Sequence, residues 1–237
     1  MTSLMGTTIQ RVAMLFFYVG LSSAFSPHPA QSYPIYAPGT MYIYDSALVL
    51  DDGYQLSVQG ILAGIIFMVV GLLLWLRGFD YGRTIQHFTT GFTTFGLIAW
   101  VMLANFEPAA TYGVNRWTIY LIVPTCIGFL GGLFIWGCDH LAVYLSLLGA
   151  QGGIAIGLWV LGWRSGLSIT STWGQAVLLS ILAGFGFIWG ACHPIGSMMG
   201  SSFAGAYLLF IGLDFFFHTG FTYCAMTTLD ANKNHSK

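Results

Sequence analysis

Few polar residues interrupt the long apolar stretches of this chain, and these are the side chains that can do chemistry in an apolar environment. Gln151 lies between Gly149 and Gly153, so its amide can form a hydrogen bond across a close helix contact or line a pore. Asp214 and His218 are four residues apart, which places them on one helix face. They can form an interfacial pair or a proton-linked site. We favour the hydrogen bond between helices for Gln151 and the interfacial pair for Asp214 and His218.

Four threonines form another group of polar residues in an apolar stretch. Thr89, Thr90, Thr93 and Thr94 lie in one apolar stretch, where each hydroxyl can bond to the backbone carbonyl one turn earlier. Such hydroxyls are easily buried, so they are weak evidence for a channel.

Two turns repeat the same four letters, FIWG, followed by cysteine and histidine. Cys138 and His140 follow the first, and Cys192 and His193 follow the second. If both turns lie on one membrane face, two cysteines and two histidines make a ligand set compatible with zinc. Their spacing differs from the usual C-x2-C pattern, and short interfacial turns explain these residues without a metal. We therefore predict no metal and no cofactor, with zinc as the alternative.

The chain contains none of four common enzyme motifs. The chain has no HExxH, no GxSxG, no GxxxxGK[ST] and no GxGxxG after a strand, so we predict that it is not an enzyme. It has 7 Lys and Arg against 8 Asp and Glu, which leaves no basic face for nucleic acid.

Six apolar stretches must position these residues. A run of about 20 apolar residues crosses a bilayer, and in hydrocarbon it satisfies its backbone only as a helix. The composition agrees, with 56% hydrophobic and 6% charged residues. The sequence predicts an all-α polytopic transmembrane bundle. The expected helices are 58–76, 84–104, 117–136, 141–162, 173–191 and 195–217.

The turns indicate an internal repeat. The segments 134–140 and 187–193 match closely, and 74–80 is a looser version with the same Trp, Gly and Asp. We infer three hairpin pseudo-repeats, with tight turns on one side of the membrane and longer connections on the other.

Small residues four apart form stripes on several helices. Such stripes let helix backbones approach closely in a membrane. We interpret them as packing within one bundle, with a pathway or a dimer face as the alternative. The candidate packing or pathway residues are Gly149, Gln151, Gly153, Gly157, Gly196, Gly200, Asp214 and His218.

The two ends of the chain are expected to differ from the bundle. Residues 1–24 contain a short apolar run ending in small residues, which predicts a cleaved signal peptide or, alternatively, an uncleaved anchor. Residues 25–55 are then a short extracytoplasmic segment, 56–221 the transmembrane domain and 222–237 a polar tail. We expect entry into the secretory pathway, with the plasma membrane or endomembranes as the location.

The turns at Trp136 and Trp189, and a last helix closing with Gly212-Leu213-Asp214-Phe215-Phe216-Phe217-His218-Thr219-Gly220-Phe221, resemble the domain shared by transmembrane 7 superfamily member 3 and transmembrane protein 198. The resemblance covers about 56–221. It implies a multi-pass membrane protein without established enzymatic activity, whose animal relatives are linked to signalling complexes and cell survival. It also implies one more helix after the Asp-Phe region, which this sequence, ending at Lys237, does not show; the helix is absent or the sequence incomplete.

The sequence thus favours a non-enzymatic membrane protein that organises or scaffolds membrane protein complexes. Its expected partners are the lipid bilayer and other membrane proteins or a second copy of itself, and no nucleic acid. The alternative is a small-solute or ion transporter or channel built around Gln151.

Overall fold

The structure is a computed structural model that describes residues 48–49, 55–56, 58–77, 83–108, 112, 116–138, 140–163, 167–169, 171–217 and 221–232. The chain divides into two units, Met1–Val58 and Gln59–Lys237. In the first unit, β1 (Leu48–Val49) pairs antiparallel with β2 (Gln55–Leu56). The predicted signal peptide and most of the segment 25–55 lie outside the described residues.

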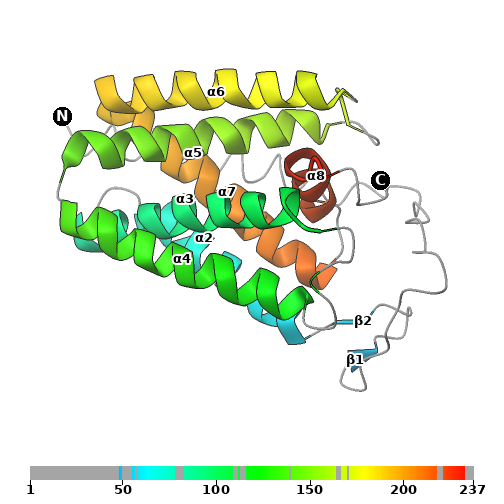
Figure 1. The fold of residues 1–237 in the computed structure, drawn as a ribbon. Coiled ribbons are helices and arrows are strands. Elements are labelled where there is room, and N and C mark those ends of the chain that lie inside the picture. Colours follow the sequence, from blue (N-terminus) through cyan, green and yellow to red (C-terminus); the bar gives the residue numbers. More distant parts are fainter. Residues whose placement is uncertain are drawn as a thin grey trace. The chain divides into compact units, whose positions relative to one another are not determined.

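The second unit is helical (Figure 1). The long helices are α2 (Val58–Arg77), α3 (Arg83–Asn105), α4 (Arg116–Cys138), α5 (Leu141–Leu161), α6 (Thr172–Cys192) and α7 (Pro194–Phe217). Each is long and apolar enough to cross a bilayer. The prediction of a polytopic all-α bundle is confirmed, and the predicted bounds differ from the observed ones by at most two residues.

In two of the three predicted hairpins, a tight turn joins the two helices. α4 ends at Cys138 and α5 begins at Leu141, while α6 ends at Cys192 and α7 begins at Pro194. Proline suits the first position of a helix, because the N–H that it lacks would have no partner inside the helix. The third predicted tight turn falls on 78–82, outside the described residues.

Glycines bring helix backbones into contact at four of the interfaces in the described residues. The facing pairs are Gly91 with Gly131 (α3 and α4), Gly149 with Gly186 (α5 and α6), Gly152 with Gly200 (α5 and α7), and Gly71 with Gly205 (α2 and α7). α5 and α6 run side by side in Figure 1. None of these four helix pairs is joined by a tight turn. Small residues, and not short connections, therefore decide where two helix backbones come into contact.

A short helix, α8 (Phe221–Leu229), follows α7 where the sequence analysis placed only a polar tail. Cys224, Ala225 and Thr228 on one side of it are buried. The Cys224 thiol donates to the Leu158 carbonyl of α5 at 3.3 Å, and burial raises the pKa of this thiol. α8 therefore packs against the end of the bundle.

Candidate functional site

Gln151 lies in the middle of α5 and is 8% exposed. Its Nε2 donates to the Thr90 carbonyl at 3.0 Å and to the hydroxyl oxygens of Thr93 at 2.7 Å and Thr94 at 2.6 Å. All three partners belong to α3. Gln151 therefore forms hydrogen bonds to α3, whereas Gly149 and Gly153 on either side of it lie against α6.

The threonines of α3 can accept these bonds because their own protons are used elsewhere. Thr93 donates to the Thr89 carbonyl at 2.9 Å, and Thr94 donates to the Thr90 carbonyl at 2.7 Å. Thr89 and Thr90 donate in the same way to carbonyls one turn earlier. The predicted bonding to their own helix is confirmed, and it leaves hydroxyl lone pairs available for Gln151.

The polar tract continues from Gln151 toward the tight turns. Tyr144 of α5 donates from its hydroxyl to Gln86 Oε1 of α3 at 3.0 Å, and its ring lies 4.3 Å from that of the buried His87. On α7, Ser197 and Ser201 are almost fully buried. Polar side chains are therefore buried on three helices, α3, α5 and α7.

The candidate glycines of α5 lie against α6. A Cβ at Gly149 would overlap the carbonyl of Gly186, and one at Gly153 would overlap the carbonyl of Leu182. At Gly157 the nearest atom is a terminal methyl of Leu179, 2.7 Å away, which can move. Gly149 and Gly153 are therefore the stricter packing positions.

The two candidate glycines of α7 contact different neighbours. A Cβ at Gly200 would overlap the carbonyl of Leu148, and one at Gly196 would lie 2.7 Å from the carbonyl of Trp189. Both contacts are with backbone. Larger residues at either position would have to displace a helix.

Asp214 is buried near the end of α7, where its Oδ2 accepts the backbone N–H of Thr222 at 2.6 Å. This bond satisfies an amide in the first turn of α8, which has no partner inside that helix. His218 lies outside the described residues, so its pairing with Asp214 stays a prediction.

The cysteines and histidines of the tight turns show no grouping. Cys192, His140 and His193 are exposed, Cys138 is partly exposed, and both thiols are free. Among the residues that the structure describes, no group of three or more His, Cys, Asp or Glu side chains can hold a metal ion. The zinc alternative gains no support from these positions.

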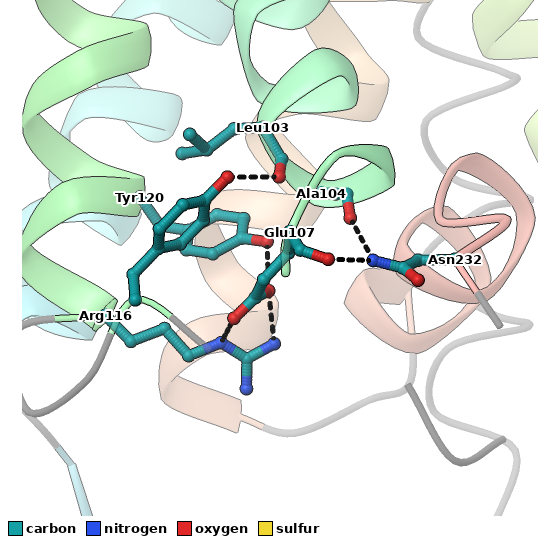
Figure 2. Close-up of polar contacts among 7 residues, drawn as sticks. Leu103, Ala104, Glu107, Arg116, Tyr120 and Asn232 are labelled. Atoms are coloured by element: carbon teal, nitrogen blue, oxygen red, sulfur yellow. Dashed lines mark hydrogen bonds and ion pairs between the residues drawn. The ribbon is translucent and has the colours of Figure 1, made fainter. Parts of the chain in front are cut away.

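A second polar cluster, which was not predicted from the sequence, lies at the opposite end of α3 and α4 (Figure 2). The Glu107 side chain is fully buried. Arg116 contacts both carboxylate oxygens, with Nε 2.7 Å from Oε1 and Nη2 2.8 Å from Oε2, and the Tyr120 hydroxyl donates to Oε2 at 2.7 Å. The only sequence signal was an acid and a base nine residues apart across a connection.

The same cluster anchors the end of the described chain. Asn232 donates from its side chain to the carbonyls of Ala104 at 3.1 Å and Glu107 at 3.0 Å (Figure 2). Asn105 donates to the Leu229 carbonyl at 3.0 Å and accepts the N–H of Ala231 at 3.0 Å. The residues after α8 are thereby held on the end of α3.

A family model described as the TM7S3/TM198-like domain matches residues 64–236 of the chain. No curated protein and no solved structure shows significant similarity to this chain.

Proposed function

Since this chain belongs to the TM7S3/TM198-like domain family, as its turn and last-helix motifs indicated, we propose that it binds other membrane proteins side by side in the bilayer and so organises them into complexes. It does this without catalysis. The candidate glycines of α5 and α7 already contact other helices of the same bundle, so they are not available to a partner. The support for the proposal therefore comes from the outer surface of the bundle.

The exposed face of α6 carries this proposal. Ala176, Ser180 and Gly184 are all exposed and follow one another at intervals of four residues. A Cβ at Gly184 would meet nothing within 4 Å. Small residues at this spacing are typical of faces where two membrane helices come together, since they let the backbones touch.

The exposed face of α2 provides a comparison within the same molecule. It bears large aliphatic side chains at helical spacing, including Leu62, Ile65 and Val69. Such a face suits contact with lipid tails. The small residues on α6 need a different explanation, and a partner helix provides one.

The test compares two exposed glycines. Gly184→Leu places a large side chain on the proposed face of α6, whereas Gly137→Leu does so near the end of α4, where a Cβ also meets nothing within 4 Å. Neither change disturbs packing inside the bundle. We expect Gly184→Leu to shift the protein from a large complex to the monomer on blue-native gels of mildly solubilised membranes, and Gly137→Leu to have no effect. An unchanged complex size with Gly184→Leu contradicts the proposal.

The cluster at Gln151 favours a second candidate function, a transporter or channel for a small solute or ion. Polar residues inside a membrane are costly and often mark pathways. A transporter should lose flux with Gln151→Ala while its melting curve and complex size are retained. A scaffold should keep its function with this change and respond to Gly184→Leu.

We also place the protein in the secretory pathway, with the tight turns at Cys138 and Cys192 facing the cytosol. A glycosylation reporter after Lys237 and another in the 78–82 connection test this topology. Modification of the terminal reporter alone supports it, and modification of the 78–82 reporter alone refutes it.

A further inference from the structure

The orientation of the Gln151 amide is fixed by its neighbours. The Thr90 carbonyl can only accept a hydrogen bond, so the amide nitrogen and not the oxygen must face α3. The hydroxyl oxygens of Thr93 and Thr94 accept from the same nitrogen. The amide oxygen therefore points away from α3.

Gln151 Oε1 is buried and has no hydrogen-bond partner among the described residues. Burying an amide oxygen in an apolar medium without a hydrogen-bond donor is energetically unfavourable. Inside a bilayer the surrounding lipid provides no donor. The position calls for a small molecule that can donate a hydrogen bond.

The buried serines of α7 and the threonines of α3 do not provide this donor. Ser197 donates to the Pro194 carbonyl at 2.9 Å, and Ser201 donates to the Met198 carbonyl at 3.0 Å. Thr93 and Thr94 likewise use their protons on α3 carbonyls. Each of these hydroxyl groups thus donates its proton to a backbone carbonyl, and its oxygen can still accept a hydrogen bond.

A cavity lies among α2, α3, α5 and α7; residues close to Gln151 and to its partners in the chain line it, and Gln151 itself does not. Its lining includes Thr89, next to the Thr90 whose carbonyl binds Gln151, and Leu148, one turn before Gln151 on α5. Gln86 and Ser201 also line it, but most of its lining surface is apolar. Its volume of about 10 Å³ is close to what one water molecule needs.

We propose that water enters the bundle through this cavity and donates a hydrogen bond to Gln151 Oε1. Water fits because it brings two protons to a region rich in acceptors. A metal cation fits poorly, since the oxygens of Thr93 and Thr94 face the amide nitrogen and the described residues contain no group of three or more His, Cys, Asp or Glu side chains that could hold one. The interior of the bundle is thus hydrated near the middle of α5.

Water-edited solid-state NMR on the full chain in lipid bilayers tests this inference. Polarisation is transferred from water protons to labelled carbon, and the Gln151 carboxamide signal is identified by its loss in Gln151→Leu. We expect this signal to build up as fast as that of the partly exposed Gln59, and much faster than the signals of Leu158, which is 4% exposed. Build-up as slow as that of Leu158 overturns the proposal.

Two adjacent serines give a matched control for the route. Both Ser201 and Ser202 donate to the Met198 carbonyl, but only Ser201 is among the residues that line the cavity. Ser201→Val should abolish the fast transfer to Gln151, and Ser202→Val should leave it intact. If Ser201→Val does not fold, Thr89→Val fills the same role. Equal transfer in the cavity variant and the Ser202→Val control overturns the route.

Discussion

Arg116 and Glu107 form an ion pair whose two halves differ in exposure, and this difference predicts unequal effects of mutation. The Glu107 side chain is 0% exposed, whereas that of Arg116 is 31% exposed. Removing the arginine leaves a charged carboxylate buried, while removing the charge of Glu107 leaves a guanidinium that can turn toward water. The arginine variant should therefore be the less stable one.

The magnitudes follow from what remains at the site. Arg116→Met should cost about 3–5 kcal/mol, the usual loss when one partner of a buried pair is removed. Glu107→Gln keeps the shape and one acceptor oxygen, and Arg116 keeps its position 5.6 Å from the rings of Trp117 and Tyr120. With partial hydration of the arginine, the expected loss is about 1–2 kcal/mol.

Unfolding by SDS in mixed detergent micelles, followed by tryptophan fluorescence, measures both changes. The double variant Glu107→Gln with Arg116→Met should be more stable than Arg116→Met alone, because no charge is left buried at this site. Far-UV circular dichroism checks that each variant starts from the same helix content. A loss for Glu107→Gln as large as that for Arg116→Met would refute the reasoning.

Three further outcomes are expected. Gly149→Ala should destabilise the bundle by about 1–3 kcal/mol, because its Cβ overlaps a backbone carbonyl of α6. Gly157→Ala should destabilise it less, because only a leucine methyl must move, and SDS titration of both variants measures the difference. Asn232→Ala removes the hydrogen bonds to the carbonyls of Ala104 and Glu107, about 1 kcal/mol each, and should speed proteolysis after α8, as followed by mass spectrometry. At pH 8 maleimide should modify Cys224 more slowly than the exposed Cys192, because burial shields the thiol and its raised pKa reduces the thiolate fraction.

The spanning helices could be predicted because they depend on length and composition alone. An apolar run such as 141–162 must be helical in a bilayer whatever it packs against. The tight turns could be predicted as well, since Pro194 and the glycines before Cys138 and Cys192 mark where helices stop. The family was recognisable from the same turns.

Helix partners and the cluster at Glu107 could not be predicted in this way. Gly149 was expected to face a helix, but nothing in the sequence shows that this helix is α6. Glu107 and Asn232 are brought together only by the folded positions of α3 and α8, which are far apart in the chain. α8 was not predicted because this short segment contains several polar residues, so its sequence does not show that Cys224, Ala225 and Thr228 lie together on a buried side.

The two polar clusters differ in how their atoms are satisfied, and this difference bears on their roles. At Glu107 both carboxylate oxygens contact Arg116, and Tyr120 adds a third contact, so the cluster is suited to holding helix ends together. At Gln151 the nitrogen has three acceptors while the oxygen has no protein partner in the described residues. Packing alone would favour an apolar residue here, since an unsatisfied amide lowers stability. A glutamine that binds α3 with one atom and leaves the other for water explains why a polar side chain is useful in the middle of α5.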